Sequence, residues 1–265
     1  MTMAAAAAAP EAAAGQGVPL RTRIFYGMGA IAYGIKDNGF SVFLLLYYNQ
    51  IVGLDPGLVG LMLLLALLLD ALIDPAVGHL SDRTRTRWGR RHPWLYASAL
   101  PIFIGWLALW MPPDASDSVQ LLWLLGFATL VRMSVSLNEV PSIALAPEMT
   151  YDYHERTSII GLRYFFGWFG GLAILAAAYG IFQLADPKFA TAEDFRSYAV
   201  AGAVIMLASV LISAIGTHRR FARPIDAAVH QPSLRDMAAC LRFRPFLILL
   251  LAAFFGFANQ GVTFA

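Results

Sequence analysis

Residues 57–79 read GLVGLMLLLALLLDALIDPAVGH, an almost unbroken apolar run that contains two aspartates, Asp70 and Asp74. A helix needs about 20 mostly apolar residues to cross the hydrocarbon core of a bilayer. The run has this length and lacks the alternation of a barrel strand, so we expect a membrane-spanning helix. An ionised side chain inside such a helix is costly and persists where it faces partners or water.

The composition of the whole chain agrees with this reading. Of its 265 residues, 58% are apolar and 14% charged, and the mean hydropathy is +0.62. Soluble domains contain about 25% charged residues, which excludes a water-soluble globule. The 13% of aromatic residues excludes a disordered chain, and a single cysteine, Cys240, excludes a disulfide framework or a cysteine-based zinc site. We predict an all-α polytopic membrane protein.

Besides the run at 57–79, six more apolar stretches have helical periodicity. The seven predicted spans cover residues 24–48, 57–79, 94–111, 119–143, 158–183, 197–217 and 245–265. Residues 1–20 form an Ala-rich stretch without the pattern of a signal peptide, and we expect a disordered cytoplasmic tail there.

The distribution of Lys and Arg predicts the orientation. Of 19 such residues, 14 fall on one side of the predicted spans, at 21–23, 83–91, 156 and 219–244, and the opposite side has only Lys188 and Arg196. Positive residues collect on the cytoplasmic side. We therefore expect a multi-pass protein of the plasma (inner) membrane with its N-terminus in the cytoplasm.

The spans group into domains. Residues 21–217 are expected to form a six-helix N-terminal bundle, and the basic segment 218–244 a central cytoplasmic loop. The span at 245–265 would then be the first helix of a second bundle, cut short, so that the chain is a fragment of a protein of about twelve helices. The alternative is a natural seven-helix protein with an extracellular C-terminus.

Seven charged residues lie within the predicted spans: Lys36, Asp37, Asp70, Asp74, Arg132, Glu139 and Arg163. Asp70 and Asp74 are four residues apart, so both carboxylates project from one face of the helix. Paired hard oxygen ligands suit Na⁺, Li⁺ or a shared proton, and Pro75 frees a backbone carbonyl as a further ligand. The alternative reading is a set of charge pairs that only hold the helices together.

A second set of charges lies on three separate spans. Asp37, Glu139 and Arg163 combine carboxylates with a guanidinium, which form paired hydrogen bonds with vicinal hydroxyls. Aromatic residues of the kind that line a sugar pocket lie close by in the sequence: Tyr33, Phe40, Tyr164, Phe165 and Trp168. We assign Lys36 to this set as well, and interpret Lys36 and Arg132 first as charge partners.

The loop after the second span, residues 78–93, has the pattern G-x-x-x-D-R-x-x-x-R-x-G-R-R. A basic loop can fix the topology or bind anionic lipid. The regular spacing of Gly, Asp and Arg in this loop is more specific than either role requires. We expect it to form ion pairs that hold cytoplasmic helix ends together and break when the protein changes state. The candidate gating residues are Asp82, Arg83, Arg87, Arg90 and Arg91.

Five motifs in this order and spacing resemble the glycoside-pentoside-hexuronide:cation symporters of the major facilitator superfamily. They are Gly34-Ile35-Lys36-Asp37, Asp70-Ala71-Leu72-Ile73-Asp74-Pro75, the loop 82–93, Asn138-Glu139-Val140-Pro141 and Arg163-Tyr164-Phe165-Phe166. The loop alone is also similar to plant-type sucrose transporters. The resemblance covers about residues 21–265 and implies the first half of a twelve-helix transporter.

The resemblance also implies roles for residues. Asp70, Asp74 and Ser136 fall on cation-site positions, and Lys36, Asp37, Glu139 and Arg163 on sugar-site positions. Ile73 replaces an Asn that assists the cation in the melibiose-transporting branch, which moves the expected coupling ion from Na⁺ towards H⁺. Val135 and Ile143 replace a Tyr and a Trp of that branch's sugar pocket, which argues against a galactoside.

We therefore expect a monomeric symporter with a sugar or glycoside and membrane lipid as its partners. Two alternatives are a lysolipid transporter of the same superfamily and a non-transporting seven-helix membrane protein. The sequence contains no enzyme motif and no nucleic-acid-binding motif. We expect no cofactor and no metal other than Na⁺.

Overall fold

The computed structural model describes residues 17–182, 184, 190–222 and 243–263. All regular secondary structure in these ranges is helical, as predicted, and their only bridge is an isolated pair between Thr86 and Gly89. Most of the tail predicted at 1–20 and most of the loop predicted at 218–244 lie outside the described residues.

The first span is a broken helix. It consists of α1 (Leu20–Met28), α2 (Ile31–Asn38), η2 (Gly39–Phe43), α3 (Leu44–Leu46) and η3 (Tyr47–Ile51), of which η2 and η3 are π-helical turns. A Cβ atom on Gly39 would lie 2.3 Å from the indole of Trp106, so the glycine lets this span approach its neighbour closely. π-helical turns in an α-helix are frequent at functional sites.

Five further helices are long and apolar enough to cross a membrane: α4 (Pro56–Arg83), α5 (His92–Leu109), α6 (Asp117–Met149), α7 (Tyr153–Gly180) and α8 (Ala192–Phe221). Most extend beyond the predicted apolar runs because polar caps set their ends. The Asp55 carboxylate accepts the Leu58 N–H at 3.0 Å at the start of α4. Thr191 and Asp194 form a capping box at the start of α8.

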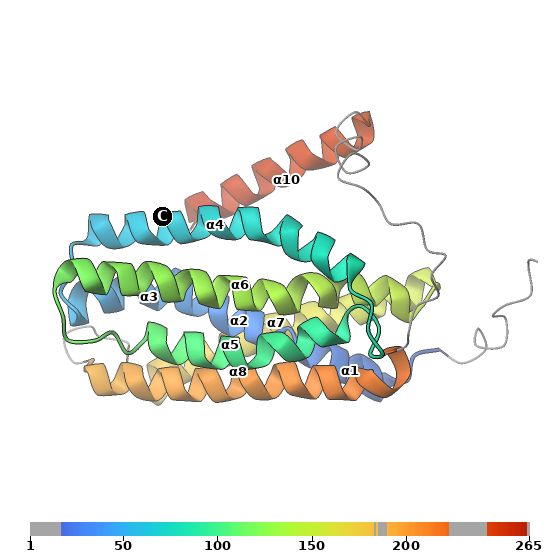
Figure 1. Ribbon diagram of the computed structural model, residues 1–265, viewed down its shortest axis with the longest axis horizontal. Coiled ribbons are helices and arrows are strands. Elements are labelled where there is room, and N and C mark those ends of the chain that lie inside the picture. Colours follow the sequence, from blue (N-terminus) through green and yellow to red (C-terminus); the bar gives the residue numbers. More distant parts are fainter. Residues whose placement is uncertain (1–16, 183, 185–189, 223–242, 264–265) are drawn as a thin grey trace, which may run out of the picture. The chain divides into compact units, whose positions relative to one another are not determined.

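The helices of the first compact unit, Met1–Pro224, run side by side in alternating directions (Figure 1). α6 packs against α4 and α5, α8 packs against α5, α1 and α2, and α7 packs against α1 and α2. The loop 84–91 and the turn 150–152 therefore lie at the same end of the bundle as the start of α1. We call this the loop end.

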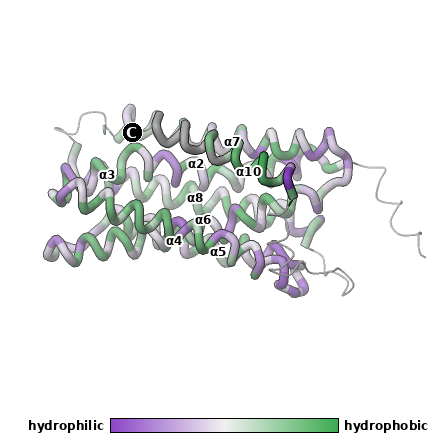
Figure 2. The backbone as a smooth tube through the Cα atoms, turned by 90° about the horizontal axis from the view of Figure 1, so that it is seen from above, coloured by the Kyte–Doolittle hydropathy of each residue, from purple (hydrophilic) through white to green (hydrophobic). Residues whose placement is uncertain are grey.

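An aromatic core lies between α5, α8 and η3. Trp110 and Phe195 stack with 5.8 Å between ring centroids, and the Tyr47 hydroxyl donates to the Trp110 carbonyl at 2.9 Å. Apolar residues follow the lengths of the helices while hydrophilic residues collect at the ends, most clearly at the loop end (Figure 2). Polar ends on apolar helices are what a membrane-spanning bundle requires.

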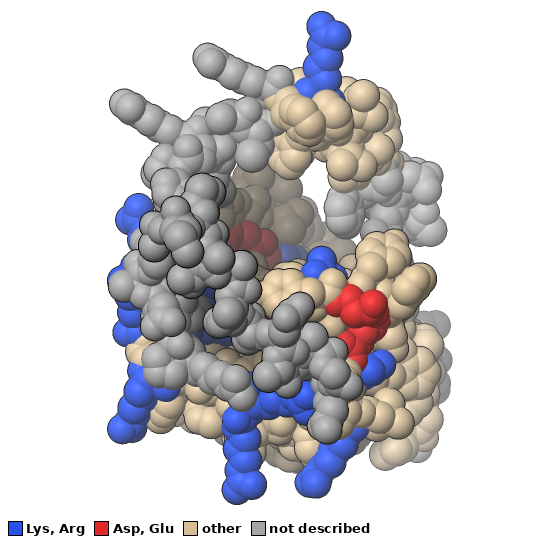
Figure 3. All heavy atoms as spheres, turned by 90° about the vertical axis from the view of Figure 1, so that its right-hand side faces the viewer, with Lys and Arg blue, Asp and Glu red and all other residues tan. Residues whose placement is uncertain are grey.

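Lys and Arg side chains gather over the loop end when it is viewed face on (Figure 3). This is the clustering that the distribution of basic residues in the sequence predicts. The cytoplasmic assignment of this end remains a prediction.

Helix α10 (Arg244–Thr263) belongs to a second unit, Ile225–Ala265, and is described by itself. Its bounds correspond to the seventh predicted span.

Candidate functional site within the membrane helices

Six of the seven predicted intramembrane charges form acid–base pairs. The pairs are Arg163–Glu139 at 2.6 Å, Arg132–Asp70 at 3.3 Å and Lys36–Asp37 at 3.9 Å. Asp74 makes no ion pair with any described residue. Pairing reduces the cost of placing a charge inside a membrane, and four acids against three bases leave the cluster with one formal negative charge.

The predicted cation set lies across the contact between α4 and α6. The Ser136 hydroxyl donates to Oδ1 of Asp70 at 3.3 Å, so the structure brings these two predicted residues together. Asp74 lies one turn further along α4, and its Oδ1 is buried without a hydrogen-bond partner among the described residues. A buried carboxylate oxygen without a donor is unfavourable, and a bound cation would remove that cost.

Arg132 is the residue of this region that the site prediction left out. Its Nη1 donates to Oδ2 of Asp70 at 3.3 Å, and its guanidinium lies 4.8 Å from the ring centroid of Phe40. The two oxygens of Asp70 are thus held by a hydroxyl and by a guanidinium. The presence of Arg132 in a span was visible in the sequence, but its partner depends on how α4 packs on α6.

The predicted sugar set is centred on Arg163. Its Nη2 donates to Glu139 at 2.6 Å and its Nη1 to the Ser142 hydroxyl at 2.8 Å. The guanidinium also lies 5.4 Å from the ring centroid of Tyr26, whose hydroxyl donates to the Ser142 carbonyl at 3.0 Å. Ser142 and Tyr26 were not predicted: both are neutral residues in apolar runs, and only the helix packing reveals them.

The arrangement around Arg163 leaves an acceptor free. Arg163 is 5% exposed, and Oε1 of Glu139 is buried without a hydrogen-bond partner among the described residues. A carboxylate oxygen in this state accepts a hydrogen bond from a ligand hydroxyl without giving up its ion pair.

Asp37 and Lys36 differ in exposure. The Asp37 side chain is 52% exposed, whereas Lys36 is buried with its ammonium 4.5 Å from the ring centroid of Tyr33. Within the described residues, Asp37 forms no ion pair with Arg163. The structure therefore places Glu139 and Arg163 in direct contact and pairs Asp37 with Lys36 instead.

The predicted aromatic residues divide in the same way. Phe40 and Tyr33 contact Arg132 and Lys36, as described above. Tyr164, Phe165 and Trp168 on α7 are 66%, 58% and 65% exposed. These three rings are therefore not buried in the helix packing of the described residues.

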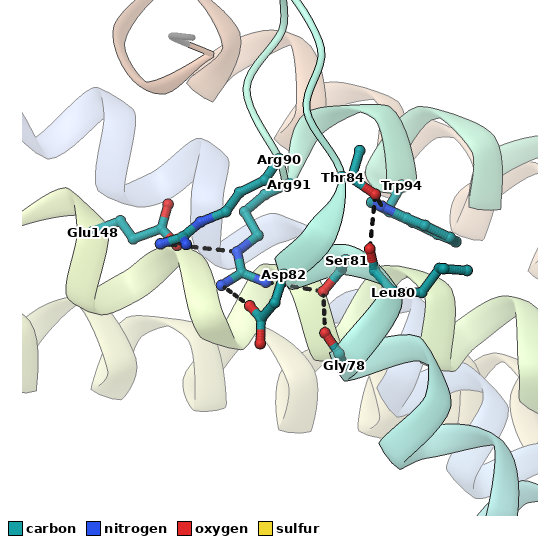
Figure 4. A network of polar contacts seen from close by, with 9 residues as sticks. All are labelled: Gly78, Leu80, Ser81, Asp82, Thr84, Arg90, Arg91, Trp94 and Glu148. Carbon is teal, nitrogen blue, oxygen red and sulfur yellow. Dashed lines mark hydrogen bonds and ion pairs between the residues drawn. The ribbon is translucent and has the colours of Figure 1, made fainter. Parts of the chain in front are cut away.

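The predicted gating loop forms a network at the loop end (Figure 4). Arg91 contacts Asp82 at 2.6 Å and Glu148 at 3.0 Å, and its Nη1 donates to the Ser81 hydroxyl at 2.9 Å. Arg90 contacts the same carboxylate oxygen of Glu148 at 2.8 Å. The network joins the ends of α4, α5 and α6.

Three of the five predicted gating residues belong to this network, namely Asp82, Arg90 and Arg91. Arg87 instead lies against Trp88, with 5.3 Å between its guanidinium and the ring centroid. The side chain of Arg83 forms no ion pair or hydrogen bond within the part of the chain that the structure describes. Glu148, which the prediction missed, is a lone acid near the end of a long helix and has no local signal that links it to the loop.

Comparison with known proteins matches this chain to a family of sugar transporters and to relatives named as symporters or transporters. The family model described as "MFS/sugar transport protein" matches residues 25–265. A symporter of Synechocystis sp. is 30% identical over 88% of this chain and 43% of the relative. The putative glycoside/cation symporter YagG of Escherichia coli is 31% identical over 60% of this chain and 35% of the relative. The isoprimeverose transporter of Lactiplantibacillus pentosus is 24% identical over 89% and 50%.

The chain spans half or less of the length of these relatives. The family match nevertheless covers almost the whole chain, including the motifs on α2, α4, α6 and α7. The helices described here, five of them able to cross a membrane, are those of an integral multi-pass membrane protein. The chain belongs to the glycoside-pentoside-hexuronide:cation symporter family of the major facilitator superfamily.

Proposed function

We propose that the whole protein transports a sugar or glycoside together with a cation by alternating access, and that residues 21–217 form its N-terminal bundle. The observation that carries the proposal is a set of intramembrane charges that, among the described residues, form three acid–base pairs and leave the carboxylate of Asp74 without an ion pair. Ionisable residues inside a membrane mark substrate or ion pathways. The relatives named as a glycoside/cation symporter and an isoprimeverose transporter point to the same class of substrate.

The sugar would bind at Glu139 and Arg163. The ion pair holds both groups in position, and the free Oε1 of Glu139 is an acceptor for a sugar hydroxyl. The remaining N–H groups of the guanidinium are donors to sugar oxygens. Asp37 and Lys36 on the neighbouring helix α2 would add contacts from the other side of the substrate.

The cation would bind at Asp74, with Asp70 and Ser136 nearby on the α4–α6 contact. A cation here would balance the single negative charge in excess within the cluster. Neutralising this charge makes the loaded state easier to move through the membrane than a state with a bare carboxylate. By linkage, a cation that raises sugar affinity must itself bind more tightly when the sugar is present.

The loop end would face the cytoplasm, in the plasma (inner) membrane, and its network would close that side in one state of the cycle. The ion pairs of Arg91 with Asp82 and Glu148 tie together the ends of three helices. Breaking them would let these helix ends separate.

The test is uptake by vesicles that contain the protein expressed from its complete reading frame. A panel of labelled mono- and disaccharides is offered first under an imposed proton gradient and then under a sodium gradient. We expect one gradient to drive accumulation of at least one sugar. We expect Glu139→Gln to lower that accumulation at least about tenfold, because the variant loses the charge that holds Arg163.

The matched control is Glu193→Gln, which neutralises an exposed glutamate whose ion pair is with Arg196 on the surface of α8. It should transport like the unaltered protein. Lysolipid flux without any sugar signal would replace the proposed substrate by a lipid. Absence of gradient-driven transport of either class would refute the symporter proposal.

A further inference from the structure

The guanidinium of Arg132 occupies Asp70, one of the two carboxylates that the coupling cation would bind. Its guanidinium donates to Oδ2 of Asp70 at 3.3 Å, and Ser136 occupies the other oxygen of the same carboxylate. Arg is charged at every physiological pH. Asp70 is therefore already neutralised by the protein itself, in contrast to Asp74.

The contact between Arg132 and Asp70 differs from a tight structural ion pair. Arg163 reaches its carboxylate at 2.6 Å and also binds a serine hydroxyl, whereas Arg132 reaches Asp70 with a single bond at 3.3 Å. The Nε of Arg132 is buried without a hydrogen-bond partner among the described residues. The contact of Arg132 with Asp70 is therefore weaker than that of Arg163 with Glu139, and a cation can compete for the Asp70 carboxylate.

Phe40 also contacts the guanidinium that binds Asp70. The ring centroid is 4.8 Å from Cζ of Arg132, and a cation–π contact of this kind stabilises the charge when water is excluded. The ammonium of Lys36, the other buried base nearby, is held by Tyr33 and Asp37 instead. Among the paired intramembrane bases of the described residues, Arg132 is the one that forms an ion pair with an α4 carboxylate.

We propose that Arg132 is the specificity-determining residue of the cation site. Its guanidinium acts as a tethered cation at Asp70. A sodium ion must compete with it there, and otherwise finds Asp74 as the one carboxylate of α4 without an ion pair among the described residues. A hard cation binds more weakly as oxygen ligands are lost and as a positive charge stands beside it. The site as built therefore disfavours Na⁺, and removing Arg132 opens a two-carboxylate site.

The proposal rests on the proposed coupling function for its role in transport, but sodium binding can be measured without a sugar. Isothermal titration of the purified protein from its complete reading frame with NaCl compares the unaltered protein with Arg132→Gln. We expect sodium affinity to rise at least about tenfold in the variant, because a unit positive charge beside the site is gone. Adding Asp70→Asn to the variant should abolish the gain.

Three further variants keep the test decisive. Arg132→Met removes the charge but keeps a long unbranched side chain, whose sulfur can contact the ring of Phe40, so it serves if Arg132→Gln fails to fold. Arg132→Lys retains the charge and should bind sodium as weakly as the unaltered protein. Arg196→Gln neutralises an exposed arginine on α8 and should change nothing.

The outcomes separate this inference from the proposed function. Tighter sodium binding in the neutral Arg132 variants supports the inference even if no sugar is transported. Equal sodium affinity in the unaltered protein and in every neutral variant that folds overturns it, even if sugar uptake is driven by a gradient.

Discussion

Asp74 differs from the other intramembrane charges in what surrounds its carboxylate. Asp70 and Glu139 each face a guanidinium, and Asp37 faces the adjacent lysine. Oδ1 of Asp74 is buried and accepts no hydrogen bond from a described residue. A buried charge without a counter-charge is energetically unfavourable. We therefore interpret Asp74 as the carboxylate that binds the coupling cation.

We predict that Asp74→Asn strongly lowers accumulation driven by an ion gradient. The amide keeps the shape of the side chain but has no charge to attract a cation, so accumulation should fall at least about tenfold. Vesicle uptake under the driving gradient measures the effect. The control is Asp114→Asn, an exposed aspartate before α6. Unchanged accumulation in Asp74→Asn would show that the coupling cation binds elsewhere.

Helices α2 and α7 meet at glycines. A Cβ on Gly34 would lie 2.0 Å from the carbonyl oxygen of Gly167 and 2.9 Å from the amide nitrogen of Gly171. Small residues allow such close approach between membrane helices. The contact places α2, with Lys36 and Asp37, beside α7, with Arg163, so the spacing of two parts of the candidate site depends on it.

We predict that Gly34→Ala destabilises the bundle by at least about 2 kcal/mol, because the added methyl group meets backbone atoms that cannot turn aside. Thermal unfolding in detergent should show a lower midpoint. Gly126→Ala is the matched control on α6, since a Cβ there meets nothing within 4 Å. That variant should be neutral or slightly more stable through its better helix propensity. Equal midpoints for the two variants would contradict the close contact.

At the scale of the whole bundle, two ionic clusters connect the helices at the loop end. One is the network of Arg91 with Asp82 and Glu148, which joins α4, α5 and α6. The other is a 2.6 Å contact between Arg23 on α1 and Glu155 on α7. Glu155 also accepts the backbone N–H of Val18 at 2.5 Å. Within the described residues, these ion pairs involve α1, α4, α6 and α7, together with the residue that precedes α5.

We predict that Arg91→Gln lowers the maximal rate of uptake by about tenfold, which corresponds to a barrier change of about 1.4 kcal/mol. The variant loses the ion pairs with both acids, so the closed arrangement of the loop end is weakened. Sodium or proton binding to the purified protein should stay unchanged because the network is remote from Asp74. Arg85→Gln, an exposed arginine of the same loop, is the control. If both variants transport equally well, the network has no role in the cycle.

The sequence by itself determined the class of the protein and the identity of its charged residues. The apolar run at 57–79 and its counterparts predict membrane helices because their length matches a bilayer. Asp74, Glu139 and Arg163 are recognisable as candidates because a charged residue in a membrane helix is costly and usually serves a function or has a partner. The ordered motifs identify the family, which the family match confirms.

Only the tertiary structure decided which of these residues meet. The pairing of Arg132 with Asp70 and the presence of Ser142 and Tyr26 beside Arg163 depend on the rotation and register of packed helices. The breaks in the first span depend on the same packing, where glycines admit a neighbour. Hydropathy predicts that a helix lies in the membrane. Because hydropathy is nearly equal on all sides of such a helix, it does not predict which face contacts the neighbouring helices.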